Sequence, residues 1–122
     1  MTKYGDFEYN DSGVCLNPVV PYKSGSWNLP HFEIRIAETP RGWVYGYMWG
    51  TPSSGGGCAC FLNDKDVFPT RPSAIVAAAK SLKESFGREA KTDKIISQLD
   101  RIIKDESNSR KIKQYTIFDY LK

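Results

Sequence analysis

The sequence predicts an α+β protein of two layers, in which a three-stranded antiparallel meander is packed by one or two C-terminal helices. Three observations lead to this prediction. Apolar and polar residues alternate from His31 to Glu38, which is the period of a half-buried strand. Two more strand-like runs follow before residue 62. After residue 70 the apolar spacing changes to three and four residues, as in an amphipathic helix.

The first thirty residues are rich in turn-forming glycine, proline, asparagine and aspartate. Such composition is typical of loops, and only the short pieces 13–16 and 19–22 suggest extended backbone. We therefore expect residues 1–30 to form a surface arm. The α+β domain is expected to span residues 31–104.

Three short strands are predicted within the domain. The first follows the alternation that begins at His31, and Thr39–Gly42 then has the composition of a tight turn. Trp43–Trp49 reads as the second strand. Gly50–Gly57 is expected to be a flexible loop because five of its eight residues are glycine or proline. Cys58–Leu62 is predicted to be the third strand.

A helix is predicted from Thr70 to about Phe86. Thr70 is a favourable N-cap, because its hydroxyl can accept a backbone N–H of the first turn. Pro72 fits in that turn, where its missing N–H costs nothing. Gly87 supplies the stop. The apolar positions on one face of this helix are Ile75, Ala79, Leu82 and Phe86.

A second helix is predicted from the cap Thr92 to about Lys104. Residues 105–113 are polar and poor in core residues. We therefore expect residues 105–122 to form a linker and a C-terminal peptide. The apolar stripe of the second helix consists of Ile95, Ile96, Leu99, Ile102 and Ile103.

Composition and charge exclude several classes of protein. No apolar run approaches the roughly 20 residues that cross a bilayer, and residues 1–6 lack the apolar stretch of a secretory signal. Three cysteines are an odd number, so a fully paired disulfide framework is not expected, and a cytoplasmic protein with reduced thiols is. The net charge of +3 divides into −1 over residues 1–60 and +4 over residues 61–122. The basic half could attract phosphates weakly, although solvated helix faces explain the same pattern.

No catalytic residue is predicted. The chain has a single histidine, His31, and no local signature places a nucleophile beside it. We therefore expect a protein that is not an enzyme and has no cofactor. One alternative is a zinc-binding module, because Cys15, His31, Cys58 and Cys60 make a formal set of four zinc ligands. The spacing is unlike a zinc knuckle, and small buried strand residues account for the cysteines as well.

The second strand carries a row of aromatic residues. In a strand, alternate side chains share one face. If this row were exposed, its rings could stack on the bases of a single-stranded nucleic acid. If it packed beneath the helices, it would be ordinary core, and this is the favoured interpretation. Gly46, on the opposite face, would let another group approach the backbone closely. The row consists of Trp43, Tyr45, Tyr47 and Trp49.

The end of the chain carries a short motif. Gln114-Tyr115-Thr116-Ile117-Phe118 resembles the bacterial sliding-clamp-binding pentapeptide: a glutamine, an aliphatic residue, a small or acidic residue, then leucine and phenylalanine. Tyr115 and Ile117 stand where that pentapeptide usually has leucine. The resemblance implies that Gln114 hydrogen-bonds in a small subsite of the clamp. It also implies that Ile117 and Phe118 fill a hydrophobic pocket.

The surroundings of the motif suit a role on DNA. Basic Arg110, Lys111 and Lys113 lie beside it and could contact phosphates. The element order of residues 31–86 also resembles that of small proteins of phages, plasmids and conjugative elements, and of three-stranded DNA-binding modules. The expected function is a non-enzymatic adaptor of a bacterial or mobile-element DNA-processing system. The alternatives are the zinc module and a structural homodimer, and the C-terminal segment could instead pack on the sheet.

Overall fold

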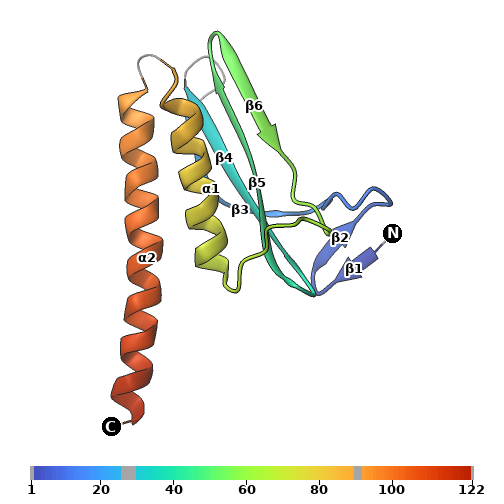
Figure 1. Ribbon diagram of the computed structural model, residues 1–122, viewed down its shortest axis with the longest axis vertical. Helices are drawn as coiled ribbons and strands as arrows, with labels where there is room; N and C mark the ends of the chain where they lie inside the picture. The colour runs from blue at the N-terminus through green and yellow to red at the C-terminus, as the bar shows by residue number, and fades with distance from the viewer. Residues whose placement is uncertain (1, 26–29, 90–91, 122) are drawn as a thin grey trace.

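The computed structural model describes residues 2–25, 30–89 and 92–121, and their side chains up to Asn108. Within these ranges the chain forms two antiparallel sheets and two helices (Figure 1). The α+β class predicted from the sequence is confirmed. The elements are β1 (Thr2–Tyr4), β2 (Phe7–Tyr9), β3 (Val19–Ser24), β4 (His31–Thr39), β5 (Gly42–Thr51), β6 (Ser54–Cys58), α1 (Arg71–Phe86) and α2 (Asp93–Leu121).

The main sheet has four strands in the order β3-β4-β5-β6, so the predicted count of three was wrong. The additional strand is β3, which pairs antiparallel with β4. It contains the extended piece predicted at 19–22, but the composition of residues 1–30 predicts a surface arm and not a place in the sheet. Its sequence, with Pro21 and Lys23, lacks the regular alternation that reveals a strand. Pairing with the long neighbour β4 supplies the stability that local sequence does not.

The hairpin of β4 and β5 is the centre of the sheet. Its pairing runs without interruption from His31 opposite Gly50 to Thr39 opposite Gly42. The tight turn predicted at Thr39–Gly42 is confirmed. Gly42 has a φ of 144°, which side chains disfavour, and the Thr39 hydroxyl donates a hydrogen bond of 2.9 Å to the Gly42 carbonyl.

The third predicted strand was placed four residues too late. The structure forms β6 from Ser54–Cys58, inside the segment expected to be a loop, while Cys58–Leu62 is not a strand beyond its first residue. Only Pro52 and Ser53 turn the chain between β5 and β6. Strand pairing uses backbone groups, so the three glycines of β6 pair with β5 although they carry no strand-forming side chain.

Helix α1 begins and ends where the sequence predicted. The Thr70 hydroxyl accepts the backbone N–H of Ser73 at 3.2 Å, and the Ser73 hydroxyl reaches back to Thr70. Gly87 ends the helix without a positive φ: its N–H donates to the Lys83 carbonyl at 2.8 Å. The predicted apolar face of α1 is buried, as its four members Ile75, Ala79, Leu82 and Phe86 are at most 2% exposed.

Helix α2 also begins as predicted, at Asp93, but ends at Leu121 rather than near Lys104. Residues 105–121 contain neither glycine nor proline and include good helix formers such as lysine, arginine and glutamate, so nothing in them stops a helix. The segment expected to be a linker therefore continues the helix. At 29 residues α2 is about 44 Å long, against about 24 Å for the 16 residues of α1.

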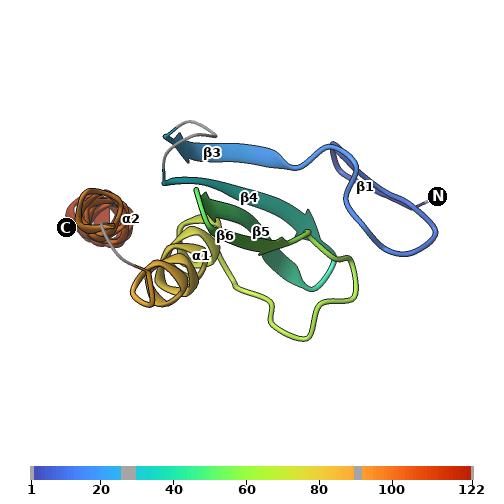
Figure 2. The same ribbon diagram turned by 90° about the horizontal axis from the view of Figure 1, so that it is seen from above.

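Both helices cover the same face of the main sheet, which gives the predicted two-layer arrangement (Figure 2). The main core lies between these layers and includes Phe32, Ile34 and Ile36 of β4. On α2, the predicted stripe is confirmed, because Ile95, Leu99 and Ile102 are buried and their neighbours Ile96 and Ile103 pack beside them.

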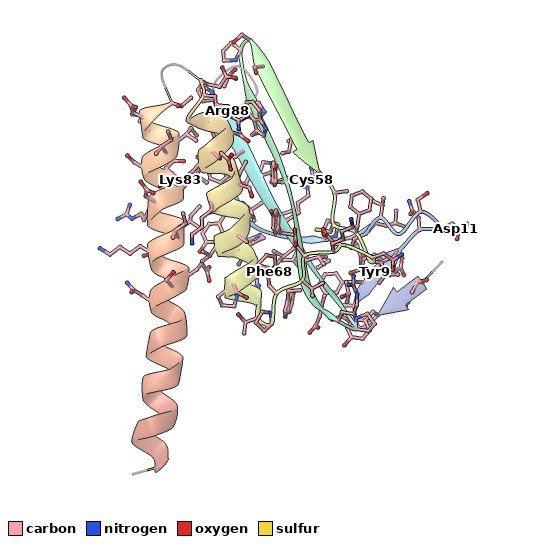
Figure 3. All side chains as sticks on the ribbon, viewed as in Figure 1. Tyr9, Asp11, Cys58, Phe68, Lys83 and Arg88 are labelled. Carbon is pink, nitrogen blue, oxygen red and sulfur yellow. The ribbon has the colours of Figure 1, made fainter. Side chains whose placement is uncertain are left out.

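A second, smaller core lies on the opposite face of the sheet, under the hairpin of β1 and β2. Tyr9 is fully buried there, and its hydroxyl donates to the Glu38 carbonyl at 2.7 Å (Figure 3). Ala37 and Val44 supply the sheet side of this core, and Cys15 and Cys60 complete it. The N-terminal residues therefore cover one part of the face that the helices leave open.

Candidate functional site

The aromatic row of β5 packs against the main core. The indole of Trp49 meets the Phe86 ring edge-on with centroids 5.5 Å apart, and the Tyr45 ring lies 5.9 Å from that of Phe68. Tyr45 also shares a hydrogen bond of 3.0 Å with the Ser81 hydroxyl of α1. The four members, Trp43, Tyr45, Tyr47 and Trp49, are all partly buried and packed against this core.

This packing confirms the core interpretation of the row. Burial raises the pKa of the Tyr47 hydroxyl, with a smaller contribution from the Cys58 thiol. The rings contact the sheet and α1, so they do not form the exposed ladder that base stacking requires. Nucleic-acid binding by Trp43, Tyr45, Tyr47 and Trp49 remains a prediction, and no exposed row supports it.

Gly46 is crossed closely by another part of the chain, as its position predicted. A Cβ atom built there would lie 2.7 Å from the Cys58 carbonyl oxygen and 2.9 Å from the Cys60 nitrogen. The segment that leaves β6 therefore turns over the open face of the sheet directly above Gly46. From there it joins the second core, where the Cys60 carbonyl accepts the N–H of Cys15 at 2.9 Å.

The four residues of the zinc alternative do not come together. Cys15 and Cys60 meet in the second core, at 6% and 1% exposure. His31 lies at one end of β4, opposite Gly50. The backbone of Cys58 lies close to Gly46, which pairs with Arg35, four residues further along β4. Among the side chains that the structure describes, no three histidine, cysteine or acidic residues form a group that could hold a metal ion.

The cysteine thiols lie in surroundings that favour their neutral form. Burial raises the pKa of Cys60 from 9.0 to about 12. Burial likewise raises the pKa of the Cys15 and Cys58 thiols, although Cys58 lies at an exposed position of β6. The cysteines therefore behave as small core and edge residues, which is the simpler of the two interpretations offered by the sequence.

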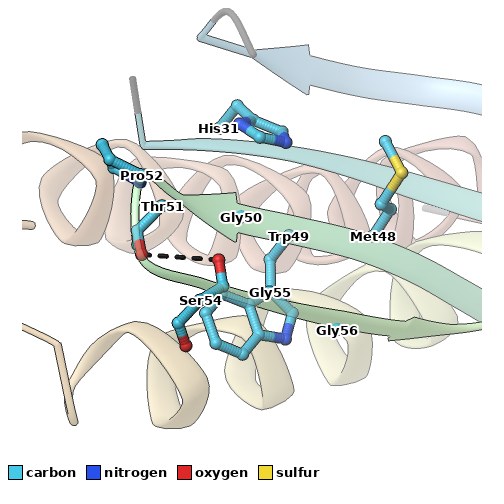
Figure 4. Close-up of a pocket in the computed structure, with 9 residues that line it drawn as sticks. All are labelled: His31, Met48, Trp49, Gly50, Thr51, Pro52, Ser54, Gly55 and Gly56. Carbon is cyan, nitrogen blue, oxygen red and sulfur yellow. Dashed lines mark hydrogen bonds between the residues drawn. The ribbon is translucent and has the colours of Figure 1, made fainter. Parts of the chain in front are cut away.

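The part of the open face that the second core leaves uncovered holds an open cavity of about 590 Å³ (Figure 4). His31 and Met48 rise from the sheet on this side, whereas the Trp49 indole lies on the other side of β5. The floor is backbone, because Gly50 and Gly55 carry no side chain. The residues that line the cavity are His31, Met48, Trp49, Gly50, Thr51, Pro52, Ser54, Gly55 and Gly56.

Glycine shapes this cavity. A Cβ atom at Gly50 would lie 2.5 Å from Cε1 of the His31 ring, so the imidazole lies directly over the bare backbone of the neighbouring strand. Met48 is 40% exposed beside it. Next to the cavity, Glu33 and Arg35 form an ion pair of 2.6 Å along β4. This cavity is not predicted by the sequence, in which the one available signal is the recurrence of glycine on adjoining strands.

The residues of the clamp-binding motif all fall within the distal part of α2. This helix runs antiparallel to α1 and extends well past the end of the sheet layer (Figure 1). The last described contact of α2 with the sheet is a hydrogen bond of 2.6 Å from the Tyr22 hydroxyl to Glu106. The side chains of Arg110, Lys111, Lys113, Gln114, Ile117 and Phe118 lie outside the described ones.

Within the described part of the chain, no helix is long and apolar enough to cross a membrane. Comparison with protein-family models, with curated proteins and with solved structures finds no match to this chain.

Proposed function

We propose that this protein is a non-enzymatic adaptor of a bacterial or mobile-element DNA-processing system. Its C-terminal peptide docks on a sliding clamp, and its α+β domain binds a second partner. The observation that carries the proposal is the shape of α2. The helix packs on the domain between Asp93 and Glu106, and its remaining turns carry the sequence Gln114–Phe118 beyond the sheet.

A helix that extends past its domain can present a peptide to a partner protein. In a helix, positions three and four residues apart lie on the same side. Gln114, Ile117 and Phe118 have this spacing, so α2 groups the three positions to which the clamp resemblance assigns contacts. The rise of 1.5 Å per residue places Phe118 about 18 Å beyond Glu106 along the helix axis. The motif therefore lies past the end of the sheet layer (Figure 1).

The charge of the distal part of α2 is compatible with DNA nearby. Arg110, Lys111 and Lys113 precede the motif by one to four residues, and a clamp encloses anionic DNA. Their contribution is expected to be electrostatic and independent of base sequence, because lysine and arginine contacts to phosphates carry no sequence information.

The test is a direct binding measurement between the full chain and a purified bacterial sliding clamp. Phe118→Ala removes the aromatic anchor, and such anchors contribute about 2 kcal/mol or more, so we expect affinity to fall by about 30-fold. Asp119→Ala, which lies next to the pentapeptide but outside it, is the matched control and should bind like the parent chain. The proposal fails if the parent chain does not bind the clamp, or if Phe118→Ala binds as tightly as Asp119→Ala.

A further inference from the structure

We propose that the outer edge of β6, together with the cavity beside it, binds an extended peptide of a partner protein by strand addition, with one large apolar side chain of that peptide lying in the cavity. The inference deepens the proposed function, since it describes the second partner of the adaptor. It uses no residue of the distal part of α2, so it can fail or succeed independently of clamp binding.

The two edges of the main sheet differ in how they are protected. The β3 edge carries Pro21 and Lys23, and its register with β4 shifts between Val19 and Tyr22. Proline, lysine and bulges are the usual features by which proteins prevent further strand pairing. Helix α2 also lies against β3, where the Tyr22 hydroxyl donates a hydrogen bond to the Glu106 carboxylate. These features disfavour the addition of a strand at the β3 edge.

The β6 edge has none of these features. The strand Ser54–Cys58 contains no charged residue and no proline, and its register with β5 is regular along all five residues. All five are exposed, and in the described part of the chain no strand pairs with the outer edge. Alternate residues of an edge strand direct backbone N–H and C=O groups outward, and glycine leaves these groups fully accessible.

The edge is also held in place before any partner arrives. The turn at Pro52 and Ser53 closes the β5–β6 hairpin, and the Ser54 hydroxyl donates a hydrogen bond of 2.8 Å to Glu89, beyond the end of α1. A peptide that pairs with β6 therefore meets a strand that is already extended. Less ordering is needed on binding, which favours affinity.

The cavity supplies what the edge lacks, namely a place for a side chain. In paired strands, opposite residues project to the same face. Gly55 and Gly57 occupy the positions of β6 whose side chains would lie on the cavity face, and glycine leaves these positions bare. A side chain of the added strand can therefore extend across them toward Met48 and His31. The exposed Met48 thioether, the Pro52 ring and the glycine backbone offer it an apolar surface.

The same geometry favours a foreign peptide over a second copy of this chain. Pairing of β6 with β6 of another molecule would bring glycines over the cavity and leave it unfilled. A peptide with alternating side chains fills it and forms the same backbone hydrogen bonds. Strand addition of this kind takes affinity from the main chain and selectivity from the pocket.

The probe is a phage-displayed library of random twelve-residue peptides, selected on the immobilised full-length chain. The enriched sequences should share a large apolar or aromatic residue with extended flanking residues. Synthetic copies should shift the amide resonances of Gly55, Gly57 and Met48 in spectra of the labelled chain. The proposal is overturned if no sequence is enriched, or if the bound peptides shift other regions instead.

Three variants locate the site. Met48→Lys places a charge in the cavity at an exposed position, and Gly55→Pro removes a backbone donor from the edge; each should weaken peptide binding at least tenfold. Val20→Lys, at an exposed position of the other edge, is the matched control and should change affinity less than twofold. Equal binding by all three folded variants contradicts the proposal. So does a concentration-dependent dimer of the free chain that Gly55→Pro dissociates, because β6 would then be occupied by its own copy.

Discussion

Leu99 offers the most direct test of how α2 is attached to the domain. It is fully buried and belongs to the main core shared by both helices and β4. Replacing a buried leucine by alanine removes its transfer free energy and leaves a cavity, which together cost about 3 to 5 kcal/mol. A domain of this size loses roughly 4 °C in Tm for each kcal/mol. Leu99→Ala should therefore lower the Tm by about 12 to 20 °C.

The control is Ile96, which lies on the same helix but is only partly buried. Ile96→Ala removes a similar volume, and we expect it to cost about 1 to 2 kcal/mol because solvent already reaches the site. Thermal and urea unfolding of the two variants, followed by circular dichroism, give the comparison. The described packing of α2 is refuted if Ile96→Ala destabilises the chain as much as Leu99→Ala, or if neither variant changes the Tm.

Two further predictions concern the other face of the sheet. Gly46→Ala should lower the free energy of unfolding by about 1 to 3 kcal/mol, since the new Cβ would lie within 3 Å of three backbone atoms that cannot rotate away. Gly55→Ala is the control, because its nearest contact would be at 3.1 Å. Equal midpoints of urea unfolding for the two variants would contradict the close crossing over Gly46. The second prediction concerns pH. Because burial raises the pKa of Cys60 from 9.0 to about 12, the unfolded thiol ionises first, so its contribution to stability is complete below pH 9.0 and is lost as the pH rises toward 12. Cys60→Ala should flatten the fall of the unfolding free energy over this range in reducing buffer, and an unchanged slope would show that this thiol does not control it.

Local sequence determined the helices and the central hairpin. A cap such as Thr70, a stop such as Gly87 and an apolar stripe three and four residues apart act within one segment, so the bounds of α1 and the start of α2 could be predicted. The alternation along β4 and the turn before Gly42 are local in the same sense. The end of α2 differs from the predicted one, because polar composition suggests a linker although nothing in residues 105–121 breaks a helix.

Tertiary structure decided what the segments without a local pattern become. β3 and β6 are strands because β4 and β5 offer them backbone partners, and a run of glycines has no period from which pairing could be predicted. The candidate binding site depends on the same pairing. Its cavity is built by His31, Met48 and Gly55 from three adjacent strands, and only the register of the sheet brings these residues together. Register is set by contacts between distant segments. The sequence alone therefore contains the residues of the site but does not show that they lie side by side.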